Sequence, residues 1–181
     1  MSKVETTRAI LLRRHDFSET SYVVALLTEA FGKIRAIAKG AKRATSPMHG
    51  ALEPMTLSDI VVYRKKQPAL HILSQAKTRE YWRGFRTDLN RFYAAHRMAE
   101  LLLSAVPDEV PQPDLFEQAA SSFRRVSEEE GVDVALFAFE SGLLRAMGSF
   151  PRTDVCLGCE KPWKKREAAA FHPISGGAYH L

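Results

Sequence analysis

The stretch ETSYVVALLTEAFGKIRAIAKGAKR, residues 19–43, sets the fold expected for the first half of the chain. Residues 22–28 are rich in β-branched and aromatic types, as expected of a buried strand. After Gly32, charges at 33, 35 and 39 fall on one strand face and apolar side chains at 34, 36 and 38 on the other. Ile37 interrupts the charged face. A basic loop follows, in which Gly40 lets the backbone approach a phosphate closely.

Short apolar runs also lie on both sides of this stretch, at residues 9–12, 57–63 and 70–76. The last two runs are joined by a basic turn over residues 64–68. About five short strands without a helical period between them are typical of a small closed barrel, which has no open sheet edge. We therefore expect residues 1–80 to form a β-barrel.

The positive charge of the chain is concentrated in this expected barrel. The net charge is +5, yet residues 1–80 alone carry 14 Lys and Arg against seven Asp and Glu. Such a concentration is typical of a surface that binds a polyanion, although a merely soluble basic surface gives the same pattern. No apolar run approaches the roughly 20 residues that cross a bilayer. No secretory signal is evident, and two cysteines make a disulfide framework improbable, so we expect a cytoplasmic protein.

Beyond residue 81 the apolar residues recur with the period of α-helices. We expect a first helix capped by Asp88 and stopped by Pro107, a second that ends before Gly131, and a third capped by Asp133. Three apolar stripes would pack together in this helical domain. They are Leu89, Phe92, His96, Ala99 and Leu103; Leu115, Phe116, Ala119, Phe123 and Val126; and Leu136, Phe137, Glu140, Leu143, Leu144 and Met147.

The C-terminal segment carries a different signal, Cys156-x-x-Cys159. Two thiolates at this spacing can share one tetrahedral zinc ion. The alternatives are a redox dithiol, which would need a βαβ context, and two thiols without a role. His172 and His180 follow, but the gap between them is longer than in a zinc finger, and Pro173 and the glycines argue against a finger helix. We therefore disfavour both histidines as ligands.

Taken in order, these motifs resemble the RecO family of recombinational repair proteins. The resemblance begins with residues 19–43 and Leu52-Glu53-Pro54, continues through the helical region, and reaches Gly148-Ser149-Phe150-Pro151 and Cys156-Leu157-Gly158-Cys159. It covers nearly the whole chain. It implies an α+β fold with three parts: a small β-barrel (OB-fold) at residues 1–80, an α-helical domain at 81–150 and a partial zinc-knuckle segment at 151–181.

RecO-like proteins bind single- and double-stranded DNA, anneal complementary strands and, with RecR, help to load RecA. The resemblance therefore implies a DNA repair mediator that is not an enzyme and that works in the cytoplasm at the nucleoid. Its implied partners are DNA, RecR and the acidic C-terminal tail of single-strand-binding protein. This tail would enter a hydrophobic pocket of the helical domain edged by basic residues, for which the chain offers Arg91, Arg97, Arg124, Arg125 and Arg145.

We expect DNA to bind two basic clusters of the barrel, which could follow a phosphate backbone with little sequence preference. The first cluster is Lys33, Arg35, Lys39, Lys42 and Arg43, and the second is Arg64, Lys65 and Lys66. Tyr22, Phe31 and Tyr63, with His71 as a weaker candidate, could stack on bases. For each of these four side chains we favour packing in the core or strands over stacking.

The chain departs from the family pattern near its end. Metal-binding members have a second cysteine pair after a Gly-Gly, whereas this sequence reaches Gly176-Gly177 and has no third cysteine. We therefore expect Cys156 and Cys159 to form an incomplete zinc site in a C-terminally truncated chain. Truncation would also leave apolar surface of the helical domain exposed.

Two other functions remain open. An RNA-binding OB-fold module would need the same basic barrel, but not the helical domain and the CxxC that follow it. A zinc-dependent enzyme that modifies nucleotides would need a His-x-Glu partner for the CxxC, which the sequence lacks. No GxGxxG, P-loop, GxSxG or HExxH motif indicates another enzyme class.

Overall fold

The computed structural model describes residues 3–48, 50–64, 70–128, 131–165 and 167–181. The chain divides into two compact units, Met1–Glu140 and Ser141–Leu181. The first unit contains the strands of the N-terminal half and the first helices, and the second contains a small hairpin and both cysteines. Among the described residues, no helix is long and apolar enough to cross a membrane.

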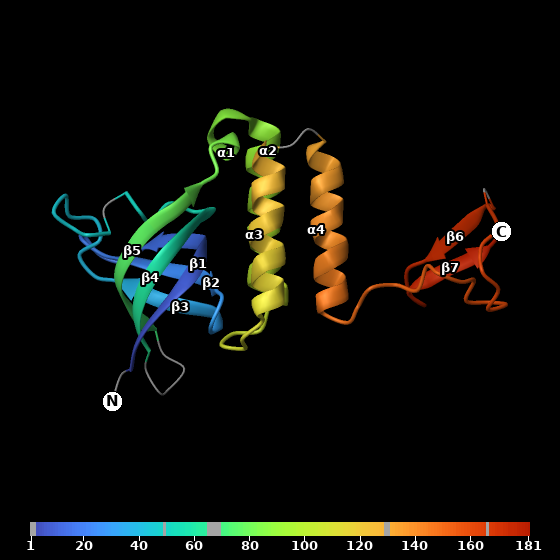
Figure 1. The fold of residues 1–181 in the computed structure, drawn as a ribbon, viewed down its shortest axis with the longest axis horizontal. Helices are drawn as coiled ribbons and strands as arrows, with labels where there is room; N and C mark the ends of the chain where they lie inside the picture. Colours follow the sequence, from blue (N-terminus) through green and yellow to red (C-terminus); the bar gives the residue numbers. More distant parts are fainter. Residues whose placement is uncertain (1–2, 49, 65–69, 129–130, 166) are drawn as a thin grey trace. The chain divides into compact units, whose positions relative to one another are not determined.

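The N-terminal half forms a closed barrel (Figure 1). The strands pair in the order β1-β2-β3-β5-β4, and β3 with β5 is the one parallel pairing among those described. A five-stranded barrel followed by helices confirms the predicted α+β class and is the architecture of an OB-fold. The strands are β1 (Lys3–Asp16), β2 (Tyr22–Thr28), β3 (Gly32–Ala38), β4 (Thr56–Arg64) and β5 (His71–Tyr81).

The barrel interior is built from alternate residues of the strands. In β3, Ile34, Ala36 and Ala38 are buried while Arg35 is exposed, as the sequence alternation predicts. β1 is longer than the apolar run at residues 9–12 because it pairs with β2 along one part and with β4 along another. The register shifts between Leu11 and Arg13, and a bulge of this kind bends the strand between its two neighbours.

Four helices follow the barrel in the part of the chain that the structure describes: α1 (Gly84–Thr87), α2 (Leu89–Ala105), α3 (Pro113–Glu128) and α4 (Val132–Ala146). The side chain of Asp88 caps α2 by accepting a hydrogen bond from the backbone N–H of Arg91 at 2.9 Å, as predicted. The prediction for α4 is wrong by a few residues, because the helix begins at Val132 and Asp133 lies inside its first turn.

The three predicted apolar stripes agree with the buried helix faces to different extents. The stripe of α3 is buried in full, as expected. In α2 the buried face is instead Ala94, Ala95, Met98, Ala99 and Leu102, because this helix packs against both β1 and α3 and small residues allow the close approach. The predicted stripe of α2 is wrong except for Ala99, and Leu89 is 66% exposed. In α4, Leu143 is buried as predicted, but Phe137 is 71% exposed and the unpredicted Ala135 and Phe139 are buried, so that stripe is wrong in part.

Aromatic packing and a close backbone contact join the barrel to the helices. Trp82, just after β5, stacks on Phe123 of α3 with ring centroids 5.2 Å apart, and Phe85 meets both rings edge-on. The segment 106–112 between α2 and α3, which we call the connector, lies against the start of β3. A Cβ atom on Gly32, whose φ is +70°, would sit 2.0 Å from the Val110 carbonyl oxygen. The barrel and the connector therefore meet backbone to backbone.

Candidate nucleic-acid interface and metal centre

Most of the described barrel cations are already paired with carboxylates. Of the twelve Lys and Arg described among residues 3–80, eight lie within 4 Å of an acidic side chain. Several of these acids come from the helical part, so the pairs hold the barrel to α2, α3 and the connector. The pairs are Lys3–Glu5, Arg8–Glu29 and Glu117, Arg13–Glu100, Arg14–Glu53, Lys33–Asp108, Lys42–Asp16, Arg64–Glu109 and Arg79–Asp59.

Lys33 and Arg64, which the sequence placed in two different DNA-binding clusters, lie under the connector. Lys33 is 9% exposed, and its ammonium group contacts the carbonyl of Leu103 and a carboxylate oxygen of Asp108. Arg64 lies 3.6 Å from a carboxylate oxygen of Glu109. The side chain of Lys33 lies on the outer face of β3, as predicted, but the acidic connector covers this end of the strand. The two other predicted residues of the second cluster, Lys65 and Lys66, lie outside the described residues.

Arg35, Lys39 and Arg43 form the remaining part of the predicted first cluster. Across the described ranges, none of the three has a carboxylate within ion-pair distance, and all three are exposed. Lys39 and Arg43 line a groove of about 330 Å³ together with Gly40, whose φ of +69° lets the chain turn there. Other residues of the groove are Thr45, Ser46, Pro47, Met48 and Ser74. The loop therefore presents free positive charge beside a concave surface.

Lys42 belongs to the same loop but fixes its position. Its ammonium group lies 2.7 Å from Asp16 and donates to the carbonyl of Ser18 at 2.9 Å. The hydrogen bond from Lys42 lowers the pKa of Asp16, so this carboxylate stays ionised at neutral pH. The Lys42 ammonium also lies 5.0 Å from the ring centre of Tyr22. Because Tyr22 packs on the barrel core beneath this cation, it is not free to stack on a base.

An apolar row runs beside the free cations on the outer face of the barrel. The strand registers place Val23 opposite Ile37, Ile37 opposite Ile72, and Ile72 opposite Tyr63. All four are partly exposed, and Tyr63 reaches 37%. Tyr63 was predicted from the sequence as a stacking candidate, whereas the row was not predicted. Ile37, the apolar residue that broke the charged face of β3, was its signal.

The other two aromatic candidates are not available on this face. Phe31 packs on the barrel core, and the guanidinium of Arg64 lies 4.4 Å from its ring centre. His71 is 1% exposed, and its Nε2 lies 3.2 Å from a carboxylate oxygen of Glu109. Tyr63 is therefore the one predicted stacking candidate that the described structure leaves exposed.

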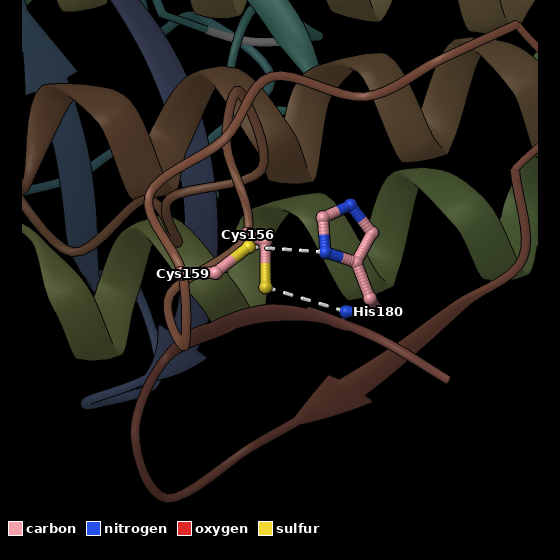
Figure 2. Close-up of side chains that lie close together, drawn as sticks. All are labelled: Cys156, Cys159 and His180. Carbon is pink, nitrogen blue, oxygen red and sulfur yellow. Dashed lines mark hydrogen bonds between the residues drawn. The ribbon is translucent and has the colours of Figure 1, made fainter.

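The second unit gathers three metal-ligand side chains: Cys156, Cys159 and His180 (Figure 2). Their ligand atoms all lie within 4.8 Å of one another, and Cys159 Sγ is 3.2 Å from His180 Nδ1. Cys156 is buried, Cys159 is exposed and His180 is half-buried. His180, which the spacing disfavoured as a ligand, lies beside the cysteines. A hairpin, β6 (Ala169–His172) and β7 (Gly177–His180), brings it there without a finger helix.

Backbone groups around Cys156 favour its thiolate. The N–H groups of His180 and Gly158 each point to Cys156 Sγ at 3.4 Å. Donation from the His180 backbone is the largest of the effects that lower the pKa of the Cys156 thiol to about 7. His172, the other histidine considered, pairs with Gly177 at the turn of the hairpin and bonds Ser175 at 3.0 Å. It therefore lies at the opposite end of the hairpin from His180.

The helical part of the first unit has a groove of about 540 Å³ between the starts of α2 and α4. Of the five arginines considered for a partner pocket, Arg91 and Arg97 line it. Arg124 instead pairs with Glu80 at 2.7 Å. The remaining lining residues are Asp88, Asn90, Tyr93, Ala94, Val132, Asp133 and Leu136. The groove is thus amphipathic, with charges of both signs at its edge.

Comparison with known proteins identifies the family. Residues 1–82 match the family model Recombination protein O N terminal, and residues 86–178 match Recombination protein O C terminal. Proteins named DNA repair protein RecO from Rhodopirellula baltica and Anaeromyxobacter sp. (strain K) are each 36% identical and cover 93% and 90% of this chain. One of the same name from Bacillus subtilis (strain 168) is 31% identical over 90% of the chain. The chain spans 63%, 63% and 61% of the lengths of these three relatives. With both halves matched in order, the chain belongs to the RecO family of DNA repair and recombination proteins.

Proposed function

We propose that this chain is a DNA-binding recombination mediator that acts without catalysing a reaction. Its barrel would bind single- and double-stranded DNA, promote annealing of complementary strands and, with RecR, assist loading of RecA in the cytoplasm at the nucleoid. The observation that carries the proposal is that the exposed cations of the predicted first cluster, Arg35, Lys39 and Arg43, have no acidic partner among the described residues. Membership of the RecO family supports it.

The binding mode follows from what this surface offers. Arg35, Lys39 and Arg43 would neutralise phosphates and release condensed counterions, which gives affinity without sequence preference. Ile37 and Tyr63 beside them offer apolar contact to the bases of a single strand. Phosphate contacts leave the Watson–Crick edges of the bases free. A strand held in this way can still pair with its complement, which is the requirement for annealing.

The experiment compares two double variants that remove the same net charge. Lys39→Ala/Arg43→Ala removes two free cations of the loop, and Lys161→Ala/Lys165→Ala removes two exposed lysines of the second unit. Binding to labelled DNA is measured by anisotropy over a range of salt concentrations. The slope of log K against log salt is negative, and it should become shallower in the loop variant. Its magnitude should fall by about 2 for duplex DNA and about 1.4 for single strands.

The control variant should leave both slopes close to the parent. Equal losses in the two variants, or no loss in the loop variant, would reject the loop as the DNA site. Competition with RNA of the same sequence decides the alternative of an RNA-binding module. Stronger competition by RNA than by DNA would favour that alternative.

For the acidic tail of single-strand-binding protein we propose the groove between α2 and α4. Its apolar residues Tyr93, Ala94 and Leu136 lie beside Arg91, which donates to the Val126 carbonyl, and Arg97, which pairs with Glu140. A carboxylate of the tail would share or replace these bonds. A labelled peptide with an acidic C-terminus should bind the parent protein and lose affinity in Tyr93→Ala. Binding that survives both Tyr93→Ala and Leu136→Ala would place the tail elsewhere.

A further inference from the structure

We infer that the connector competes with DNA for a second phosphate-binding site, at the beginning of β3. Lys33, Arg64 and His71 form this site. In the structure the carboxylates of Asp108 and Glu109 occupy it. A DNA strand that displaces the connector would gain these basic groups. The inference rests on the DNA binding proposed above and extends it beyond the basic loop.

The two carboxylates contact the basic groups as a bound phosphate would. Glu109 divides its oxygens: Oε1 lies 3.2 Å from His71 Nε2, and Oε2 lies 3.6 Å from a guanidinium nitrogen of Arg64. Asp108 Oδ1 lies 3.3 Å from the ammonium group of Lys33. Basic side chains of these types bind carboxylate and phosphate oxygens alike. Because His71 is 1% exposed, a phosphate can reach it only after the connector has moved.

Polar contacts hold the connector to the barrel more than burial of its own side chains does. Val106 is buried and anchors its start, but no side chain from 107 to 112 is buried, and Val110 is 45% exposed. The N–H of Glu109 donates to the carbonyl of Lys33 at 2.8 Å. Another anion can replace a carboxylate in an ion pair, whereas it cannot replace a buried apolar side chain. The connector is therefore suited to displacement by a polyanion.

The backbone of Glu109 also favours release. Its φ of +57° lies in the left-handed region, which is unfavourable for a residue with a Cβ atom. The contacts of its carboxylate with His71 and Arg64 offset this strain while the connector lies on the barrel. Phosphates that take over these contacts would let the strain relax.

The covered site continues the line of free charge on the barrel. Lys33 lies on the outer face of β3, and Arg35 and Lys39 follow it on the same face, both exposed. Six residues separate Lys33 from Lys39, which is about 20 Å along an extended chain. One DNA strand could therefore contact both ends of β3 once the connector has moved.

The test measures affinity for a labelled single strand by anisotropy at constant salt. Asp108→Asn/Glu109→Gln keeps the shape of the connector and removes both carboxylates. The side chains of Asp108 and Glu109 are 57% and 34% exposed, so their ion pairs together should shift the opening of the connector by about 5–30-fold. Apparent affinity is proportional to the open fraction and should rise by about the same factor. Arg64→Gln in this background should remove most of the gain.

Two further variants separate release of the connector from a general change of charge. Gly32→Ala displaces the connector by steric contact with the Val110 carbonyl, leaves the charge unchanged and should also raise affinity. Glu128→Gln/Asp133→Asn removes the same charge from two exposed acids outside the connector. This matched control should stay within about twofold of the parent. Circular dichroism checks that each variant is folded, and the charge variants decide the matter if Gly32→Ala does not fold.

Amide hydrogen exchange observes the connector directly. Saturating DNA should speed exchange of the Glu109 N–H in the parent protein, and unchanged or slower exchange would overturn the inference. Parent-like affinity in folded Asp108→Asn/Glu109→Gln, a gain that survives Arg64→Gln, or an equal gain in the control would overturn it as well. Lys39→Ala/Arg43→Ala keeps the two proposals apart. Weaker binding by this variant without a gain in the connector variant rejects the competition alone, whereas parent-like binding rejects the basic loop as the DNA site.

Discussion

The close contact between Gly32 and the connector makes a measurable prediction about stability. Gly32→Ala introduces a Cβ atom where the Val110 carbonyl oxygen would be 2.0 Å away, at a backbone φ of +70°. Gly50→Ala is the matched control, because Gly50 has a φ of +75° but nothing within 4 Å of the added atom. Both variants share the cost of a left-handed alanine, which is about 1–2 kcal/mol. Gly32→Ala alone must also displace the connector.

The additional cost follows from the contacts that the connector makes. Its displacement breaks the hydrogen bond from the Glu109 N–H to the Lys33 carbonyl, which is 2.8 Å long, at about 1 kcal/mol. It also leaves the largely buried ammonium group of Lys33 without Asp108 and the Leu103 carbonyl, at about 1–3 kcal/mol. We therefore expect Gly32→Ala to lower the free energy of unfolding by about 2–4 kcal/mol more than Gly50→Ala does.

Urea unfolding measures this difference. Trp82 is 2% exposed and reports on the first unit by fluorescence, and a Trp163→Phe background removes the second tryptophan. With a slope near 2 kcal/mol per molar urea, the midpoint of Gly32→Ala should lie about 1–2 M below that of Gly50→Ala. Midpoints that agree within about 0.3 M would refute the backbone contact between barrel and connector.

Three further predictions test other parts of the structure. Phe123→Ala removes the ring stacked 5.2 Å from Trp82 and should cost about 3–5 kcal/mol by urea unfolding, and a loss below about 1 kcal/mol would contradict this packing. Hydrogen bonding from Arg124 lowers the pKa of Glu80 from its usual 4.5, so the stabilisation by this pair is present above that pH and is lost as pH falls through the lower folded value. Arg124→Ala should therefore lower stability by about 0.5–1 kcal/mol at pH 7 and by less in acid, and an unchanged difference in acid would contradict the linkage. Tyr63→Ala should weaken binding of single strands by about 1–3 kcal/mol while leaving duplex binding nearly unchanged in anisotropy titrations, and equal losses for both would argue against stacking.

The barrel could be predicted from sequence because its alternating pattern is local. The alternation at residues 33–39 identifies both faces of β3, and the structure buries the side that was expected. The sequence predicted a closed barrel but not the order in which its strands pair, because no local signal determines that β3 pairs with β5 in parallel. β1 was predicted too short because its outer residues, such as Arg8 and Arg13, bind acids of the helices rather than contribute to an apolar run.

The helices were predictable in position but not in orientation. A cap such as Asp88 is a local signal and was read correctly. The buried face of α2 depends on which neighbours it meets, and Ala94, Ala95 and Ala99 are buried while Leu89 stays exposed because the helix packs closely on β1 and α3. Hydrophobicity alone favours the larger side chains, so the sequence indicated the wrong stripe.

The candidate metal ligands also show how much of a site local sequence signals can predict. Cys156 and Cys159 are recognisable because their spacing is itself the signal. His180 is not, because its distance from the cysteines along the chain depends on a hairpin whose length no zinc-finger pattern describes. The Gly176-Gly177 pair was the available signal: read as a turn rather than as a break, it returns the following strand to the cysteines.

The basic residues of the barrel have two roles, and the ion pairs show which residues have which role. Acids of α2, α3 and the connector neutralise Arg8, Arg13, Lys33 and Arg64, so part of the basic excess attaches the helices to the barrel. Charge counting cannot distinguish these residues from the free cations Arg35, Lys39 and Arg43. What distinguishes them is the position of the acidic connector, which covers the beginning of β3 and leaves its end uncovered. A polyanion that approaches the barrel therefore meets uncompensated charge at the loop that begins with Lys39.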